Sequence, residues 1–535
     1  MTAAVLYLAL LAYAPLVFST IRAASREKLR DRVFLRTIAK DYLRTLPTLA
    51  LASLPVVAFP AYTRAYVVGM HLVFMPLAML ELGHVWMFGA RMGLNTFYSL
   101  FVTNMQETAE YIRNNLAKSQ LILALAVYFL PLAALWRLQP VVFASRWTRL
   151  AWAAGLVALA VPLVRNFFRK GPRRKTGYVL NPFVSVFYHY ALYRRQYCEL
   201  RRQIAAHAAP RFEGIRSSVP ADVPETYVVC IGESANSMHC SYAGYSRRTN
   251  EFTEAVEGLR SYTGVRSQYA QTLPSLEKAI TFATDAEPDL LFRKGSIVDY
   301  FRDAGFKVFW LSNQYALEDT AITAMAGHAD VVKCCNYSSM KGFETAGYDG
   351  ALLPEFERVL DDPAPKKAVF LHMIGSHSAY VNRYPAEFRR FEGAAPGKEG
   401  LSASATELLN SYDDSIRYTD WVIAELVKRL AVRGGSAAES LVYFADHGED
   451  CFDTSADKIL GHSQLANVPM TSVPLQVWLS PRLVELRPGL AARAAHPKKS
   501  YRLEQIVHLL IDVASLSNPD FSPEDSLFPK EQPPE

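Results

Sequence analysis

Five long apolar runs occupy the first third of the chain, and each approaches the ~20 residues that a helix needs to cross a bilayer. The runs cover residues 1–21, 46–62, 65–88, 121–138 and 147–164. The first run has no basic segment at its start and four more runs follow it, which favours a retained helix over a cleaved signal peptide. The pattern predicts five membrane spans, with the two ends of the chain on opposite sides of the membrane.

The charges between the first two spans leave the orientation open. Eight arginines and lysines lie between residues 22 and 44, and the positive-inside rule places such a loop in the cytoplasm. With five spans, the C-terminal half would then be cytoplasmic as well. Alternatively, residues 22–44 form an interfacial helix against anionic headgroups, and the C-terminal half faces the other side.

Two further segments differ in composition from the spans. Residues 95–118 are polar but keep several aromatic side chains, which predicts an amphipathic segment at the membrane surface; a solvated loop helix fits the same pattern. Basic and then aromatic side chains follow the fifth span, and a polar stretch with prolines ends near residue 224. We therefore divide the chain into a transmembrane domain (1–170), an interfacial helix with a linker (171–224) and a C-terminal domain (225–535).

Short apolar runs alternate with helical patterns in the C-terminal domain. Strands are predicted at residues 227–231, 307–311, 368–374, 441–445 and 474–479, and helices at 276–282, 297–304 and 405–432. Such alternation indicates a mainly parallel sheet covered by helices. The predicted fold is an N-terminal five-helix transmembrane domain followed by a C-terminal α/β domain.

Composition narrows the class of partner. The net charge is +6 at pH 7, and the basic residues cluster beside the apolar runs, which favours membrane headgroups over nucleic acid. The six cysteines form no CxxC pair, so a cysteine zinc site is disfavoured. Disulfides are compatible with the even count, but the sequence does not choose a pairing.

Polar groups gather where two predicted strands end. Asp446 and His447 follow the strand at 441–445, and Glu233 follows Gly232 after the strand at 227–231. Ligands of open α/β sheets bind at the carboxyl ends of the strands. A carboxylate oxygen together with an imidazole suits zinc. Each of these residues by itself could equally be a cap or a turn former.

Thr272 lies two residues before Pro274, and proline is favourable in the first turn of a helix. The sequence therefore places Thr272 just before a helix N-terminus, where threonine is often only an N-cap. The same position suits phosphate chemistry, because backbone N–H groups and the helix dipole stabilise an anion there. A metal ion would lower the pKa of the hydroxyl much further.

Histidines add to this set. His372 and His377 follow the apolar run at 369–371, and His462 follows Gly461. A lone histidine is more often structural than a ligand. Four histidines that accompany a glutamate, an aspartate and a positioned threonine predict a metal-dependent site.

These residues and their neighbours resemble the membrane phosphoethanolamine transferases, a family of the alkaline phosphatase/sulfatase superfamily. The resemblance covers the five-span half, Thr103, Asn104, Glu107 and Thr108, and the motifs at residues 231–234, 241–249, 372–377, 382–385 and 445–449. Residues 276–283 and 361–367 look closest to the branch that modifies the core heptose of lipopolysaccharide.

The resemblance implies a zinc held by Glu233, Thr272, Asp446 and His447, with Thr272 as the nucleophile. His372, His377 and His462 would surround the phosphoryl and leaving groups, with a second zinc as an open alternative, and His377 or His462 would act as general acid or base. Asn104, Glu107 and Thr108 would contact the ethanolamine headgroup.

The implied reaction moves phosphoethanolamine from phosphatidylethanolamine to lipopolysaccharide, on a core heptose or a lipid A phosphate, through a covalent threonine intermediate. The implied location is the bacterial inner membrane, with several spans and a periplasmic catalytic domain. The product carries a new ammonium group, which lowers the negative surface charge and links the family to polymyxin resistance.

Three other functions compete with this interpretation. A sulfatase or related phosphodiesterase shares the superfamily, but sulfatases need Cys or Ser where Thr272 stands and Arg where Leu276 stands. A phosphoglycerol transferase of the lipoteichoic acid type shares a threonine nucleophile and would differ in its headgroup pocket. A transporter or scaffold with a vestigial domain should carry ionisable residues within its spans, and only Glu81 and His84 qualify.

Overall fold

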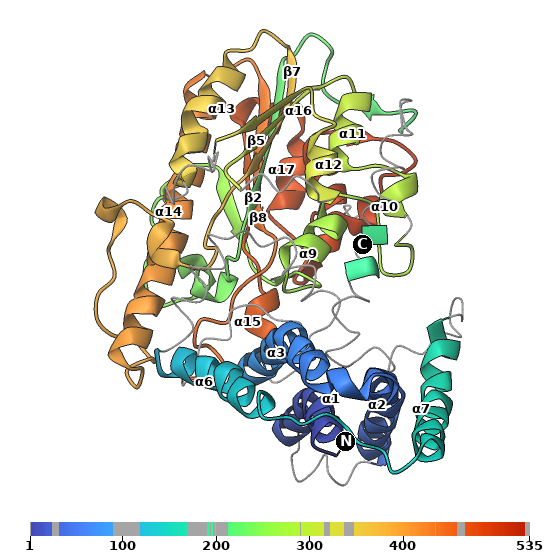
Figure 1. Ribbon diagram of the computed structural model, residues 1–535. Coiled ribbons are helices and arrows are strands. Elements are labelled where there is room, and N and C mark those ends of the chain that lie inside the picture. The colour runs from blue at the N-terminus through green and yellow to red at the C-terminus, as the bar shows by residue number, and fades with distance from the viewer. Residues whose placement is uncertain are drawn as a thin grey trace. The chain divides into compact units, whose positions relative to one another are not determined.

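The computed structural model describes two compact units, Met1–Gln196 and Tyr197–Glu535 (Figure 1). The described residues are 2–23, 32–88, 118–167, 190–192, 194–195, 198, 212–288, 290–314, 321–335, 347–433, 435–456 and 466–529. The finer division at residues 170 and 224 stays a prediction.

In the N-terminal unit a helix covers most of each predicted span. Its long helices are α1 (Thr2–Ala23), α2 (Arg32–Ala58), α3 (Thr63–Phe88), α6 (Lys118–Leu135) and α7 (Arg146–Phe167), with a short 3₁₀ turn at Pro60–Tyr62. Within the described residues, Pro60–His84 and Arg146–Arg165 are long and apolar enough to cross a membrane. The other three helices carry shorter apolar stretches, Ala3–Ala14, Tyr42–Ala58 and Ile122–Leu135. The count of five spans therefore stays a prediction.

From residue 32 onwards, the basic segment after the first span belongs to the same helix as the second apolar run. Helix α2 runs without a break from Arg32 to Ala58 and so joins the basic residues to the second apolar run. One buried side chain ties three helices of this unit together through two polar contacts. His71 of α3 bonds through Nδ1 to the hydroxyl of Tyr7 in α1, and its Nε2 lies 2.9 Å from the carbonyl oxygen of Tyr128 in α6.

A seven-stranded sheet forms the centre of the C-terminal unit, in the order β3-β9-β8-β2-β7-β5-β6. The strands are β2 (Glu225–Gly232), β3 (Leu259–Tyr262), β5 (Lys307–Ser312), β6 (Val331–Cys334), β7 (Lys366–His372), β8 (Ala438–Ala445) and β9 (Leu475–Leu479). The five strands from β8 to β6 are parallel, as predicted.

The sheet is nevertheless mixed, because β9 runs antiparallel to both β8 and β3. Phe444 near the end of β8 pairs with Leu475 at the start of β9. The chain therefore re-enters the sheet at the edge where it left, without the crossover that a parallel neighbour requires.

Helices cover both faces of this sheet (Figure 1). Val228 and Cys230 of β2 pack with α13 (Leu352–Leu360) and α14 (Ala403–Arg433), whereas Val229 and Ile231 pack on the other face. This alternation is the two-residue period of a strand buried on both sides. The second face carries α9 (Thr272–Ala279), α11 (Ile297–Asp303), α12 (Ala321–Ala326) and α18 (Ile506–Val513).

Short elements complete the unit. They are β1 (Arg216–Ser217) paired with β11 (Leu516–Ser517), β4 (Val265–Arg266) paired with β10 (Tyr501–Arg502), and the helices α10 (Leu290–Arg293), α15 (Val468–Thr471), α16 (Pro481–Leu486) and α17 (Pro488–Ala494). The six cysteines are unpaired in this structure.

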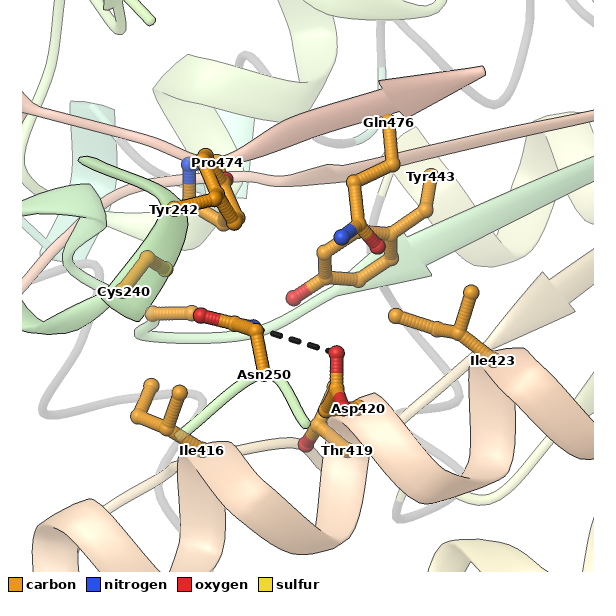
Figure 2. A pocket seen from close by; sticks show the side chains of 11 residues that line it. Cys240, Tyr242, Asn250, Ile416, Thr419, Asp420, Ile423, Tyr443, Pro474 and Gln476 are labelled. Atoms are coloured by element: carbon orange, nitrogen blue, oxygen red, sulfur yellow. Dashed lines mark hydrogen bonds between the residues drawn. The ribbon is translucent and has the colours of Figure 1, made fainter. Parts of the chain in front are cut away.

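Helix α14 buries carboxylates as well as apolar side chains. Asp420 accepts hydrogen bonds from Asn250 Nδ2 at 3.1 Å, from the N–H of Phe252 at 2.8 Å, and from both the N–H and the hydroxyl of Thr253. Figure 2 shows Asn250 and Asp420 facing each other beside a cavity of about 10 Å³, which Tyr443 of β8 also lines. These bonds fix the segment around residue 250 to α14.

Replacing Asp420 with Ala should therefore destabilise the C-terminal unit. The change leaves several buried donors without an acceptor, which should cost about 3 kcal/mol. Thermal unfolding of the purified protein, followed by protease sensitivity, measures this loss.

Glu425→Ala is the matched control on the same helix. Glu425 pairs at the surface with Lys428 and Arg429, and such pairs contribute at most about 1 kcal/mol. Equal stabilities of the two variants would show that Asp420 does not hold the 250 segment.

Candidate active site

The sheet brings the two predicted strand-end motifs together. Strands β2 and β8 are parallel neighbours, with Gly232 opposite Ala445. Glu233 and Asp446 therefore leave adjacent strands at the same edge, and His447 follows directly. All three side chains are at most 2% exposed.

Thr272 reaches this cluster from α9. Its hydroxyl oxygen lies 3.1 and 3.3 Å from the two carboxylate oxygens of Glu233 and 3.4 Å from His447 Nε2. The predicted position is wrong by one residue, because Thr272 is the first residue of the helix and Gln271 is the N-cap. The hydroxyl faces Glu233 instead of capping its own helix, so the alternative role as an N-cap is excluded.

The donor atoms of Glu233, Asp446 and His447 all lie within 4.8 Å of one another. His447 Nε2 is 3.3 Å from Glu233 Oε1 and 3.5 Å from Asp446 Oδ2. His447 Nδ1 donates to the carbonyl of Gly448 at 2.9 Å, so Nε2 is the nitrogen that faces the carboxylates. A bound metal would replace the proton on Nε2, and the ring would then be in the tautomer that a metal-ligating histidine requires.

The two oxygens of Asp446 differ in a way that also points to a cation. Oδ1 accepts the N–H groups of Ser234 and His447, at 3.1 and 2.7 Å. Oδ2 is buried and has no hydrogen-bond partner among the described residues. A buried carboxylate oxygen without a donor is costly, so a metal ion fits this set of oxygen and nitrogen donors, and zinc suits their types.

The protonation of the cluster reflects the same crowding. Burial and the neighbouring Glu233 raise the pKa of Asp446 to about 7. Burial alone would lower the pKa of His447, but the charges of Asp446 and Glu233 raise it to about 10. Burial alone would raise the pKa of Glu233, but its bond to His447 and the charge of that ring depress it. Without a bound cation, the protonated ring of His447 supplies the positive charge beside the two carboxylates.

A third loop packs directly onto Glu233. Gly375 has φ +50°, and a Cβ there would lie 2.6 Å from the carbonyl oxygen of Glu233. The N–H of Ser376 donates to that same oxygen at 2.9 Å. Asp349 holds the loop from the other side by accepting the N–H groups of Ile374 and Gly375, each at 2.9 Å. Only glycine allows this close approach.

His372 and His377 belong to this loop but not to the metal-ligand cluster. His372 ends β7, and its Nε2 is buried without a hydrogen-bond partner in the described part of the chain. Burial lowers the pKa of His372 to about 4 despite the charge of Glu233. The charge of His377 acts on Glu233, so both histidines lie near the cluster. Their predicted roles stay predictions.

Four predicted site residues lie outside the described residues: His462, Asn104, Glu107 and Thr108.

Two contacts of Glu233 are absent from the predicted site. Ser234, at φ +58°, donates its hydroxyl to Glu233 Oε1 at 2.9 Å. Gln314 donates to Glu233 Oε2 at 3.2 Å and to the carbonyl oxygen of Met373 at 2.7 Å. Gln314 follows β5, so the rule that selected Glu233 and Asp446 at strand ends could also have found it.

The fold and this site define a class: an α/β domain with a metal-ligand cluster and a threonine hydroxyl at the carboxyl edge of its sheet. The chain belongs to the sulfatase family, whose model, described as "Sulfatase", matches residues 225–514.

Named relatives narrow the class further. The chain is 28% identical over 502 residues to phosphoethanolamine transferase EptC of Escherichia coli K12, which covers 89% of this chain and 84% of the relative. Phosphoethanolamine transferase CptA of Salmonella typhimurium is also 28% identical, with the same coverage. The resemblance to phosphoethanolamine transferases is thereby confirmed.

Solved structures agree. The periplasmic domain of E. coli EptC in complex with Zn is 29% identical, with a TM-score of 0.55, over 61% of this chain and 92% of that one. The integral membrane protein EptA of Neisseria meningitidis matches 99% of this chain and 98% of its own, with a TM-score of 0.70. At 18% identity, EptA supports the fold of the whole chain and no more.

Asp446→Ala should remove the tightly bound metal, because it deletes the buried oxygen that accepts no hydrogen bond within the described residues. We expect elemental analysis to find about one zinc per chain in the unaltered protein and almost none in the variant. Asp299→Ala, which removes a buried carboxylate of α11, is the control and should keep its zinc. A full zinc content in Asp446→Ala would contradict the ligand assignment.

Proposed function

We propose that the protein transfers phosphoethanolamine from phosphatidylethanolamine to lipopolysaccharide in two steps, with Thr272 as the nucleophile. The observation that carries the proposal is the position of the Thr272 hydroxyl. It lies at the N-terminus of α9, within hydrogen-bond distance of Glu233 and beside His447. A nucleophile and a proton acceptor in contact, beside a site for a cation, are what a covalent mechanism requires.

In the first step, the Thr272 oxygen forms a bond to the phosphorus of phosphatidylethanolamine. The bond from phosphorus to the diacylglycerol oxygen breaks, the Thr272 hydroxyl gives up its proton, and diacylglycerol leaves with one proton in return. The hydroxyl of Thr272 points at the carboxylate of Glu233, which orients the lone pairs of the oxygen for attack. Zinc bound by Glu233, Thr272, Asp446 and His447 would lower the pKa of this hydroxyl and stabilise charge on the phosphoryl oxygens.

In the second step, an acceptor oxygen attacks the phosphoethanolamine–threonine, and Thr272 is regenerated. His377 or His462 is our candidate to carry the proton, and His372 would lie with them around the phosphoryl and leaving groups. The N-terminal backbone of α9 stabilises negative charge on the phosphoryl group in both steps. The acceptor is a core heptose or a lipid A phosphate, and its product carries one additional ammonium group.

We further propose an inner-membrane protein with five spans and a periplasmic catalytic domain. The support is the helical match to all five apolar runs and the likeness of the whole chain to an integral membrane transferase. Both lipid substrates are then accessible to the site, and Asn104, Glu107 and Thr108 contact the headgroup of the donor. The basic residues of 22–44 then lie against lipid headgroups.

Thr272→Ala should abolish turnover by several orders of magnitude, because it removes an essential nucleophile. In the unaltered protein, incubation with phosphatidylethanolamine alone should add one phosphoethanolamine to the peptide that contains Thr272, as peptide mass spectrometry would show. Thr272→Ser should retain activity, since the hydroxyl remains. An active Thr272→Ala enzyme would disprove the covalent mechanism.

The topology is tested with fusions after residue 535. Alkaline phosphatase folds only outside the cytoplasm, so this fusion should be active. A fluorescent protein exported in the unfolded state should be dark. The reverse pair of results would place the catalytic domain in the cytoplasm and exclude lipopolysaccharide as the acceptor.

A further inference from the structure

The buried face of α14 bonds directly to two of the loops that carry the site. Tyr412 donates its hydroxyl to the carbonyl oxygen of Ser234 at 2.8 Å and accepts the N–H of Asn236 at 2.9 Å. Ser415 donates to the hydroxyl of Ser376 in the third loop at 2.9 Å. A helix that must align several loops therefore uses hydrogen bonds, which are directional, in addition to apolar packing.

Asp413 of α14 collects three donors on this face. It is fully buried, and it accepts hydrogen bonds from His239 Nδ1, the Tyr245 hydroxyl and Arg247 Nη1, each at 2.7 Å. All three donors come from the segment after β2, beyond Glu233. This segment is thus anchored to α14 by charge-assisted bonds, which are shorter and stronger than neutral ones.

His239 connects this anchor to the segment after β8. Its Nε2 lies 3.2 and 3.3 Å from the two carboxylate oxygens of Asp453, which is six residues beyond His447. Asn236 makes a parallel link, since its Nδ2 donates to the carbonyl oxygen of Glu449 at 3.0 Å. His239 is fully buried, so water does not replace either contact.

We propose that His239, held as an imidazolium between Asp413 and Asp453, is a positioning residue that fixes the segments after β2 and β8 relative to each other. These segments begin with Glu233 and with Asp446 and His447, so His239 acts on the metal site through them. The inference rests on the proposed role of these residues as metal ligands. His239 itself contacts none of them in any bond described above.

The charge of the ring is required by its two partners. A neutral imidazole has one N–H and one lone pair, so one of its nitrogens would face a carboxylate without a proton between them. Burial alone would lower the pKa of His239, but the two carboxylates raise it to about 9. Other groups around this pair are Tyr412, Tyr245, Arg247 on Asp413, Lys398 on Asp453, and Cys451.

The pH dependence follows from this raised pKa. Its ordinary value is 6.5, so the stabilisation by the imidazolium is complete below pH 6.5 and is lost as the pH rises through about 9. A histidine that only fills space would contribute the same stabilisation at every pH.

The test compares zinc dissociation constants of the full-length protein in detergent, measured by chelator competition from about pH 7 to 10. At pH 7, His239→Gln should bind zinc about tenfold more weakly than the unaltered protein, as expected when a residue that supports metal ligands is lost. The ratio of the two constants should fall towards one above pH 9, where the unaltered protein also loses the charge. Asp453→Asn, which removes the other charge of the contact, should weaken zinc binding in the same direction and serves if His239→Gln does not fold.

His328→Gln is the matched control. His328 also pairs with a buried carboxylate, that of Asp299 on α11, at 2.6 Å. This pair lies outside the site, so the zinc dissociation constant of His328→Gln should equal that of the unaltered protein. Equal constants for His239→Gln and the unaltered protein at pH 7, a ratio that does not change with pH, or an unaltered protein without tight zinc would each overturn the proposal. The zinc measurement uses no lipid, so its result does not depend on whether the protein transfers phosphoethanolamine. The proposed reaction is tested by the Thr272 variants instead.

Discussion

The burial of two carboxylates beside one imidazole is the condition on which the rest of the site depends. Glu233 and Asp446 are almost completely removed from water, and isolated charges in such a place are costly. The protein meets part of this cost with its own donors, from Ser234, Gln314 and backbone N–H groups. Asp446 Oδ2 receives none among the described residues. A divalent cation is the partner that completes the set.

Such a cluster has to be held by the fold, because the charges do not stabilise it by themselves. Helix α14 does this with an unusual buried surface, in which Asn410, Ser411, Tyr412, Asp413, Asp414 and Ser415 are all buried. Apolar packing alone would leave the loops free to slide, whereas hydrogen bonds fix their register. The three loops that carry Glu233, His377 and Asp446 all bond to this one stretch or to residues anchored on it.

The strand-end rule explains why much of this could be predicted from sequence. Parallel strands end at the same edge, so polar residues after the runs at 227–231 and 441–445 were expected at one edge of the sheet. That the two strands are direct neighbours is shown by the structure. The direction of β9 could not be predicted. The hydrophobic pattern of a run indicates that it is a strand, but not whether it pairs parallel or antiparallel with its neighbour. Nor could the bridge from His239 to Asp453 be predicted, since both partners depend on loops whose paths only the packed structure shows.

The whole C-terminal domain identifies the family, whereas single residues of the site determine the chemistry. The sulfatase family match follows from the sheet and its loops, and the same scaffold supports more than one reaction. A sulfatase needs a residue that can be oxidised to formylglycine, and Thr272 cannot be, because its side chain is a secondary alcohol. Its hydroxyl is bonded to Glu233 and adjacent to His447, which is the position that the proposed covalent mechanism requires of its nucleophile. The identity of that one residue therefore argues against a sulfatase, whereas the choice between a phosphoethanolamine transferase and a phosphoglycerol transferase depends on the headgroup pocket and is narrowed by the named relatives.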